Sequence, residues 1–415
     1  KDWRAGWITY PWREDTGVSN PTPRFRRDFK TDGEVTSARL YITALGLYEA
    51  HINGQRVGDA LFTPGWTAYD KRLQYQVYDV THLVRVGPNA IGVTLGDGWY
   101  RGRLLWGEPE ERESLPRNLW GDRLALLAEL RVTYADGSID TIATNQRWQA
   151  SPGPILYSDI YDGELYDATR DKPGWAEPYG GKGWRRARGF RGKVPPLVSS
   201  YGPPVRAVEK LRAVALDQQP GGSVIVDFGQ NLVGWVRLQA KGDAGQRVTL
   251  RHAEVLNPDG TLYTDNLRSA RAEVEYVLDG TYRYYEPRFS FQGFRYAEVS
   301  GYPGDLKAED IEAVVIHSAM SRTGHFETSH AGINQLQSNI LWGQKGNFLD
   351  VPTDCPQRDE RLGWTGDAQV FAPTAAFNLD VAPFFHKWLA DLALEQGEDG
   401  SVPNVVPDAL SLIHI

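Results

Sequence analysis

The residues best suited to do chemistry lie together near the C-terminal end of the sequence. Between Asp350 and Asp367 the chain places five carboxylates, two arginines and one tryptophan within eighteen residues. Prolines and glycines break any helix through this segment, so we expect a long connection between two helices. Polar side chains gathered on such a connection carry function more often than scaffold positions do.

Two interpretations of this segment are open. One is a solvated acidic loop whose charges form ion pairs, although such a loop has no need of the large aromatic Trp364. The other is glycoside hydrolysis, in which a carboxylic acid must stay protonated near neutral pH. Burial beside an aromatic ring and nearby like charges both raise a carboxyl pKa. Glu360 has Trp364 four residues on and Asp354 and Asp367 on either side.

Composition limits the other function classes. The 415 residues carry a net charge of -8, with 41% hydrophobic and 24% charged residues, which is typical of a soluble protein with two or three domains. No basic patch stands out, so no nucleic-acid partner is expected. No apolar run approaches the ~18 residues of a membrane span. The single cysteine, Cys355, excludes an intramolecular disulfide. Secreted and cytoplasmic locations both remain open, as does the oligomeric state.

The first half of the chain has the pattern of β-structure. After a lead segment, 1–24, short apolar-polar strands recur with turns between them, including Asn53-Gly54 and Asp136-Gly137. This spacing predicts a β-sandwich over 25–200, in which 151–190 is mostly irregular. A proline-rich linker, Pro195–Pro204, leads to a second predicted sandwich over 201–318.

After Ser318 the apolar period changes to that of helices. The spacing predicts helices at 332–343, 367–377 and 382–396, with Asp367 as the cap of the second. Pro373 falls inside that second helix and is expected to disturb it. Residues 319–415 therefore form a third, helical unit.

Taken together, these motifs resemble the bacterial α-L-rhamnosidases of glycoside hydrolase family 78, over nearly the whole chain. The most specific match is Asp354–Asp367. The others are Tyr48–Phe62 with Thr63–Thr67, Gly96–Gly102, Asp227–Trp235 and Phe291–Tyr296. The resemblance implies a multidomain fold, mainly β followed by α: two antiparallel β-sandwich domains and then the first helices of an (α/α)6 barrel.

The resemblance also implies roles for single residues. Glu360 would be the general acid, while Asp354, Arg358, Trp364 and Asp367 would line the subsite that binds rhamnose. The neighbouring Asp359 and Arg361 receive no role, and ion pairing is the default expectation for them.

Enzymes of this family invert configuration, so a second carboxylate must activate water ~6.5–9.5 Å from the acid. The family's base is a glutamate much later in the barrel, and Glu395 and Glu398 lie too early to match it. We therefore expect the natural protein to continue beyond this chain, the base to be absent here, and the truncated chain to be inactive. Leu410–Ile415 is expected not to be native. With the barrel incomplete, its first helices should leave large apolar side chains without partners: Trp342, Phe371, Phe385, Trp388 and Leu392.

No cofactor and no metal are expected in the catalytic region, where His317, His325 and His330 lack the spacing of a metal site. Other members carry a calcium-assisted rhamnose-binding module near the N-terminus. The candidate ligands for such a calcium are Asp97, Asp159, Asp162 and Glu164, each of which is by default a turn residue.

The leading hypothesis is inverting hydrolysis of terminal non-reducing α-L-rhamnose residues from glycans or plant glycosides. A rhamnose-containing carbohydrate is then the expected partner, and the aglycone stays open. Two alternatives remain: a non-catalytic carbohydrate-binding fragment, and another inverting (α/α)6 glycosidase with a different sugar.

Overall fold

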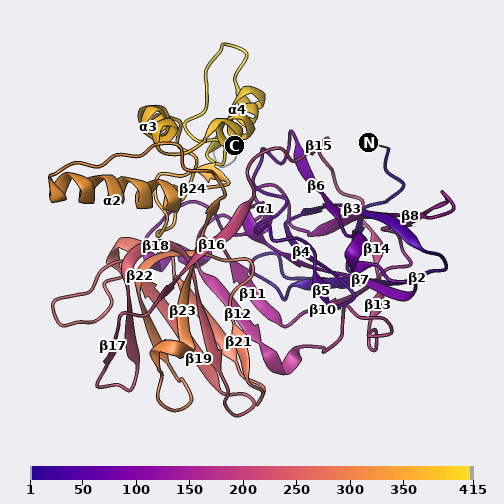
Figure 1. Cartoon of the computed structure of the whole chain (residues 1–415), viewed down its shortest axis with the longest axis horizontal. Helices are drawn as coiled ribbons and strands as arrows, with labels where there is room; N and C mark the ends of the chain where they lie inside the picture. The colour runs from indigo at the N-terminus through magenta and orange to yellow at the C-terminus, as the bar shows by residue number, and fades with distance from the viewer. Residues whose placement is uncertain (1, 412–415) are drawn as a thin grey trace.

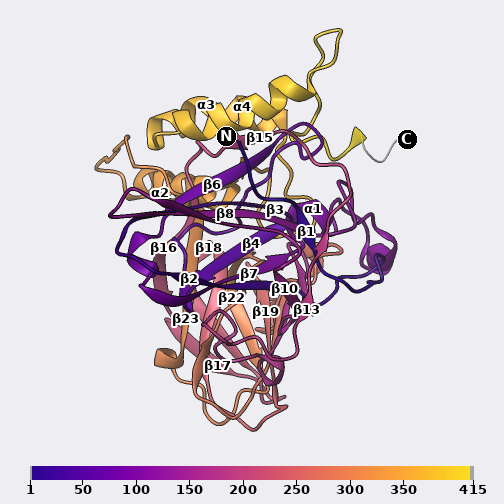
Figure 2. The same cartoon turned by 90° about the vertical axis from the view of Figure 1, so that its right-hand side faces the viewer.

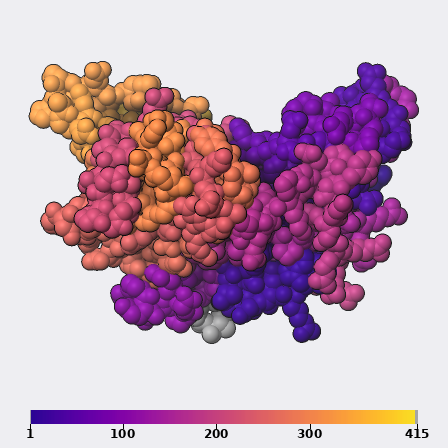
Figure 3. Space-filling view, turned by 90° about the horizontal axis from the view of Figure 1, so that it is seen from below, coloured from indigo at the N-terminus to yellow at the C-terminus, as the bar shows by residue number. Residues whose placement is uncertain are grey.

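The computed structural model describes residues 2–411, so most of the segment expected to be non-native, 412–415, lies outside the described residues. Two β regions lie side by side, the first on the right in Figure 1 and the second on the left, and three helices lie above the second region and its junction with the first. Seen from below, the first region (indigo to magenta) and the second (mainly orange) form two adjoining masses (Figure 3). The predicted order of two β domains followed by helices is confirmed.

The first β region consists of two facing sheets. One has seven strands in the order β14 (Arg188–Gly189), β1 (Ile8–Thr9), β8 (Ala125–Tyr134), β3 (Val35–Leu45), β6 (Leu73–Asp79) and β15 (Leu197–Ser199), with β9 (Ile139–Ala143) on β8. The other has the order β13 (Arg185–Arg186), β10 (Gln149–Pro152), β2 (Pro23–Thr31), β7 (Gly87–Gly96), β4 (Leu47–Ile52) and β5 (Gln55–Arg56). Alternate residues of β3, such as Leu40 and Ile42, point into the core between the sheets.

The second β region is one curved sheet of ten strands around its own core. Along the sheet the order is β11 (Ile155–Asp159), β12 (Gly163–Asp167), β20 (Glu273–Val277), β19 (Arg247–Ala253), β22 (Gln292–Ser300), β18 (Val224–Ala240), β23 (Ile311–Ser318) and β16 (Val205–Arg212). Two further strands, β17 (Ala215–Gln218) and β21 (Arg283–Tyr285), pair with β18.

The structure corrects the sequence prediction in two places. Residues 151–190 are not mostly irregular, because β11 and β12 lie there, and β12 pairs in parallel with β20 of the second sheet. Gly163 allows this pairing, since its φ is +114° and a Cβ would lie 1.7 Å from the Glu273 carbonyl oxygen. The expected lead segment also contains a strand, β1, which joins the first sheet.

The three predicted helices are present as α2 (Ala331–Asn347), α3 (Thr365–Asn378) and α4 (Ala382–Glu395), and a fourth, α1 (Gly98–Arg101), is a single short turn. The predicted cap is wrong: Trp364 occupies the cap position of α3. Asp367 lies in the first turn instead, where the helix dipole stabilises a negative charge. Pro373 lies inside α3, as predicted. No helix in the described part is long and apolar enough to cross a membrane.

The large apolar side chains of the helices were expected to lack partners, but most of them pack against the β regions. Trp388 of α4 is only 3% exposed and donates a hydrogen bond to the Val406 carbonyl at 2.9 Å, so it does not lack partners. Phe385 and Leu392 also pack against the core of the first region, and Trp342 packs against that of the second. Phe371 belongs to a smaller cluster between the helices. The apolar residues left exposed are others, including Val370 and Leu336.

Candidate active site

A loop connects the short strand β25 (Val351–Pro352) to α3, and β25 pairs with β24 (Phe348–Leu349). Arg361 fixes this loop to the second β region. This side chain is buried, and it donates to five oxygens: those of Arg358 (2.8 Å), Ile160 (3.0 Å), Phe291 (2.9 Å) and Gln357 (2.7 Å), and the Gln292 amide (3.2 Å). None of these is a carboxylate. The default expectation of an ion pair is therefore wrong for Arg361, which holds the loop by hydrogen bonds.

Asp359 fastens the same loop to both β regions. Its Oδ2 accepts hydrogen bonds from the Gly107 amide at 2.9 Å and from the amide and hydroxyl groups of Ser269. Its side chain is fully buried, and its Oδ1 lies 4.0 Å from the guanidinium of Arg268. Amide and hydroxyl donors, more than an ion pair, thus hold Asp359, so its neighbour Glu360 has a fixed position.

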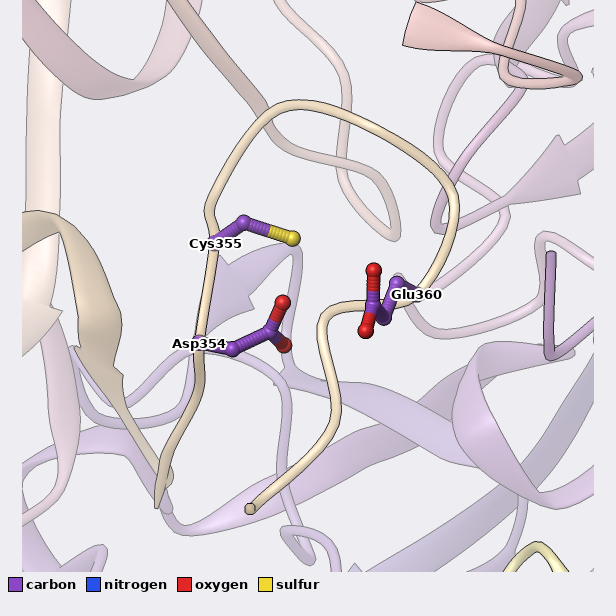
Figure 4. Close-up of side chains that lie close together, drawn as sticks. All are labelled: Asp354, Cys355 and Glu360. Atoms are coloured by element: carbon purple, nitrogen blue, oxygen red, sulfur yellow. The ribbon is translucent and has the colours of Figure 1, made fainter. Parts of the chain in front are cut away.

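Glu360 has an unusual backbone conformation. Its φ is +123°, a value that costs energy for any residue with a side chain, and Arg361 after it also has a positive φ. The Glu360 carbonyl accepts a hydrogen bond from the Tyr161 hydroxyl. This strained turn directs the carboxylate toward Asp354 and Cys355 across the loop (Figure 4).

Two arginines hold one oxygen of the Glu360 carboxylate. Arg268 Nη2 lies 3.0 Å from Oε2, and Arg358 approaches the same oxygen with Nε at 3.1 Å and Nη2 at 3.0 Å. The sequence predicts an aromatic ring and carboxylates as the main neighbours of Glu360. The ring of Trp364 instead faces Trp106, with centroids 6.2 Å apart. The expectation is therefore wrong for Trp364 but right for Asp354, whose carboxylate lies within 4.8 Å of that of Glu360; the groups in direct ion-pair contact with Glu360 are two guanidinium groups.

Sequence reasoning missed Arg268. It follows the short 3-10 helix Asp265–Leu267 of the second β region, with φ at +54°, and its partner Glu360 is 92 residues away in sequence. An isolated arginine in a loop of another domain has no spacing signal that relates it to the site. The fold alone brings it there.

Arg358, which contacts Glu360, also lies within hydrogen-bonding distance of Asp354. Asp354 Oδ2 lies 3.5 Å from Arg358 Nη2, and Asp354 Oδ1 accepts a hydrogen bond from the Leu362 amide at 3.2 Å. Burial raises the pKa of Asp354, and the negative charge of Glu360 adds to this rise. Asp354, Arg358 and Glu360 therefore form one charged cluster across the loop.

The same cluster offers a set of potential metal ligands, but their chemistry does not fit a metal. Ligand atoms of Asp354, Cys355 and Glu360 lie within 4.8 Å of one another. Burial raises the pKa of the Cys355 thiol to about 12, whereas a metal requires the thiolate. The two arginines also supply the positive charge that a cation would bring to Glu360.

Asp354 and Asp367 line one cavity of about 530 Å³ between α2, β24–β25 and the start of α3. Apolar side chains, including Ile340, Phe348 and Phe371, form much of its remaining wall. Arg358, Glu360 and Trp364 do not line this cavity. Four of the five predicted residues thus fall into a charged cluster on the loop and a neighbouring apolar cavity, with Asp354 in both, while Trp364 packs against Trp106 and belongs to neither.

The four carboxylates considered for calcium are buried and already have positive or amide partners. Asp97 pairs with Arg101 and Arg117, Asp159 with Arg117, and Asp162 with Arg103. Glu164 accepts hydrogen bonds from the amides of Arg288 and Phe289, and burial raises its pKa to about 7. Arginine charges occupy the surroundings in which a calcium ion would need free carboxylates, so the arrangement does not fit that ion.

The three histidines are dispersed. His317 is buried on β23, where its Nδ1 lies 2.8 Å from the Ser318 carbonyl oxygen, and His330 caps α2. His325 is exposed between these two elements.

Glu395, at the end of α4, has a carboxyl group whose pKa is raised by burial. Its Oε1 accepts a hydrogen bond from the Asp408 amide at 2.9 Å, while burial, together with the nearby carboxylates, raises its pKa to about 8. The folded state thus favours the neutral form of Glu395. This preference stabilises the fold fully below pH ~4.5, and the stabilisation is lost as the pH rises toward 8.

We expect Glu395→Gln to reduce the fall in melting temperature between pH 5 and pH 8. The exposed Glu398→Gln is the matched control, and equal curves for both variants would contradict the assignment.

Comparison with known proteins adds three adjoining domain matches. Residues 33–209 match the alpha-L-rhamnosidase N-terminal domain, 217–317 the bacterial alpha-L-rhamnosidase concanavalin-like domain, and 321–414 the bacterial alpha-L-rhamnosidase 6 hairpin glycosidase domain. An alpha-L-rhamnosidase of Streptomyces avermitilis is 47% identical over 97% of this chain, and one of Formosa agariphila is 40% identical over 99% of it.

Solved structures agree with these matches. The crystal structure of the Streptomyces avermitilis alpha-L-rhamnosidase complexed with L-rhamnose superposes with a TM-score of 0.91 over 94% of this chain and 38% of that one. The Aspergillus terreus enzyme, 44% identical, gives 0.93 over 97% of this chain and 47% of that one. The chain spans 39% and 45% of the length of the two curated relatives. Because all three domain matches name the same enzymes, the chain belongs to the bacterial α-L-rhamnosidases of glycoside hydrolase family 78.

Proposed function

We propose that the protein of which this chain is part is an inverting α-L-rhamnosidase. It removes terminal non-reducing α-L-rhamnose residues from glycans or plant glycosides. The proposal is supported mainly by the fixed cluster of Asp354, Arg358 and Glu360, in a chain 47% identical to a rhamnosidase crystallised with L-rhamnose. Release of the aryl group from an aryl α-L-rhamnoside, but not from the matching α-L-arabinoside or fucoside, tests it. Preference for another sugar would favour the alternative of a different inverting glycosidase.

In this mechanism Glu360 is the general acid. Both arginine contacts go to Oε2, so Oε1 is left to carry the proton to the glycosidic oxygen. After the transfer, Arg268 and Arg358 stabilise the negative carboxylate that forms. The strained turn and the anchors at Asp359 and Arg361 fix the direction of this proton, which the reaction requires.

Asp354, Arg358, Trp364 and Asp367 form the proposed subsite for the terminal sugar. The carboxylates of Asp354 and Asp367, which share a cavity, accept hydrogen bonds from sugar hydroxyls. Arg358, a third of whose side chain is exposed, donates to them. The apolar wall of the cavity suits the methyl group that distinguishes a deoxy sugar such as rhamnose.

The general base is proposed to lie in the part of the relatives that this chain does not span. Glu395 contacts the Asp408 amide at the end of α4, and Glu398 is exposed in the following turn. Among residues 2–411, neither forms a hydrogen bond or ion pair with the loop that carries Glu360. The 415-residue chain alone is therefore expected to bind sugar without hydrolysing it, which is the non-catalytic alternative applied to this fragment.

Asn substitutions test the sugar-binding roles. In the full-length protein, Asp354→Asn and Asp367→Asn should each weaken L-rhamnose binding about tenfold or more, because each removes a charged hydrogen bond worth ~1.5–3 kcal/mol. Asparagine at 354 still accepts the hydrogen bond from the Leu362 amide, so the loop is retained. Titration calorimetry measures the affinity, and the exposed Asp380→Asn serves as the control. Unchanged affinity in both variants would favour a merely solvated loop.

A further inference from the structure

A groove on the first β region gathers positive charge. Its volume is about 1110 Å³, and it lies along β1, β13, β14 and the segment after β14. Six exposed cations line it: Arg13, Arg185, Arg186, Arg188, Arg191 and Lys193. Asp122 is the one carboxylate among its lining residues. The expectation that no basic patch stands out is therefore wrong: five of these cations lie within nine residues, and the fold adds the sixth.

These cations differ from the buried arginines elsewhere in the chain. Arg72, Arg101 and Arg103, for example, each form short ion pairs with buried carboxylates. Within residues 2–411, none of the six groove cations forms an ion pair. Unpaired positive charge concentrated in a hollow creates a local positive potential, although the whole chain carries a net charge of -8. The groove is therefore suited to an anionic ligand.

The walls of the groove are ordered by strand pairing and hydrogen bonds. β14 pairs with β1, and β13 pairs with β10, so Arg185, Arg186 and Arg188 are built into the two sheets. Arg123 also lines the groove, where it donates to Thr9 Oγ1 at 3.0 Å and to the Trp12 carbonyl at 3.1 Å. Four half-buried or buried aromatic residues line it too: Trp12, Tyr100, Trp120 and Phe190.

The groove is separate from the proposed catalytic region. In Figure 1 the strands β13 and β14 lie below and away from α2 and α3, which flank the cavity of Asp354 and Asp367, and Figure 2 shows the same for β13. No residue lines both the groove and that cavity. A ligand in the groove would therefore leave the catalytic loop free.

We propose that this groove binds an acidic polysaccharide, whose carboxylate or sulfate groups pair with the arginines while its sugar rings lie against the aromatic side chains. Guanidinium groups match such oxyanions with two parallel hydrogen bonds. A nucleic acid offers similar charges, but nucleic-acid-binding domains are strongly basic as a whole, unlike this chain. The site goes beyond the proposed hydrolysis and does not depend on it, since it would hold a polymer and not a terminal neutral sugar.

The test uses the 415-residue chain and polygalacturonate as the probe, with binding measured at low salt. The variant Arg186→Gln/Arg188→Gln/Arg191→Gln should bind at least tenfold more weakly than the unmodified chain. The matched control, Arg212→Gln/Lys241→Gln/Lys307→Gln, removes the same charge from exposed positions outside the groove and should change affinity less than twofold. Melting temperatures of both variants should stay close to that of the unmodified chain.

Further binding experiments distinguish a specific site in the groove from non-specific electrostatic attraction. Added salt should weaken binding, neutral dextran should not bind, and Phe190→Ala should weaken binding of polygalacturonate without changing its salt dependence. Three results would overturn the proposal: no binding of polygalacturonate by the unmodified chain, equal losses in the two triple variants, or tighter binding of a single-stranded oligonucleotide than of polygalacturonate. Binding is measured without turnover, so its failure and that of the proposed hydrolysis are distinguishable.

Discussion

Replacing Glu360 by glutamine in the full-length protein is expected to lower kcat by ~10²–10⁴-fold on rhamnosides with poor leaving groups. Glutamine keeps an oxygen for Arg268 and Arg358, so the loop should keep its shape, but it has no proton to give. The loss should be much smaller on aryl rhamnosides whose leaving group departs without protonation. The measurement compares kcat on both substrates.

The ratio of the two losses in the same variant gives a second readout, because only a general acid acts more strongly on the poor leaving group. The exposed Glu398→Gln is the control and should retain activity on both substrates. Equal losses of Glu360→Gln on poor and good leaving groups would argue against the acid role and for a structural one.

Asp391→Asn is expected to destabilise the chain by ~3–5 kcal/mol, because it leaves a buried arginine without its counter-charge. Asp391 of α4 is fully buried, and its two oxygens take hydrogen bonds from Arg72 at 2.7 and 2.8 Å. Arg72 also donates to the Lys387 carbonyl at 2.7 Å. This pair fastens α4 to the first β region, so its loss should free the helical end.

Unfolding of the chain in denaturant, followed by circular dichroism, measures this effect. Asp59→Asn breaks the exposed pair with Arg206 and should cost only ~0–1 kcal/mol. The double variant Arg72→Met/Asp391→Leu should recover much of the loss, since apolar replacement of a whole buried pair is often neutral. A loss below about 1 kcal/mol in Asp391→Asn would show that α4 does not depend on this pair.

The parts of the fold that follow from local pattern were predicted from the sequence. Apolar spacing located α2, α3 and α4, and turn signals such as Asn53-Gly54 located the strands of the first β region. β11 and β12 were not predicted, because β12 is placed by parallel pairing with β20, more than a hundred residues later, and β11 is placed by pairing with β12. No local pattern encodes such a partner.

The candidate site divides in the same way. The motif between Asp354 and Asp367 could be identified, but the arginine contacts of Glu360 could not. A spacing of four residues places Trp364 beside Glu360 only on a helix, whereas φ of +123° at Glu360 takes the chain out of any helix. Arg268 comes from another domain, and Arg361 satisfies oxygens that only the folded chain brings together.

The grouping of charge also depends on the fold. The sequence shows Arg185, Arg186 and Arg188 as neighbours, yet only the pairing of β14 with β1 places them in one groove with Arg13. Likewise Asp97, Asp159 and Asp162 have the composition of a calcium site, until the structure places Arg101, Arg103 and Arg117 against them.

The most direct test of the central claim is the configuration of the sugar first released, followed by proton NMR as the full-length protein hydrolyses an aryl α-L-rhamnoside. If Glu360 acts as the acid opposite a distant base, β-L-rhamnose must appear first and then mutarotate. The 415-residue chain alone should release no sugar. Initial release of α-L-rhamnose, or hydrolysis by the 415-residue chain alone, would contradict the account.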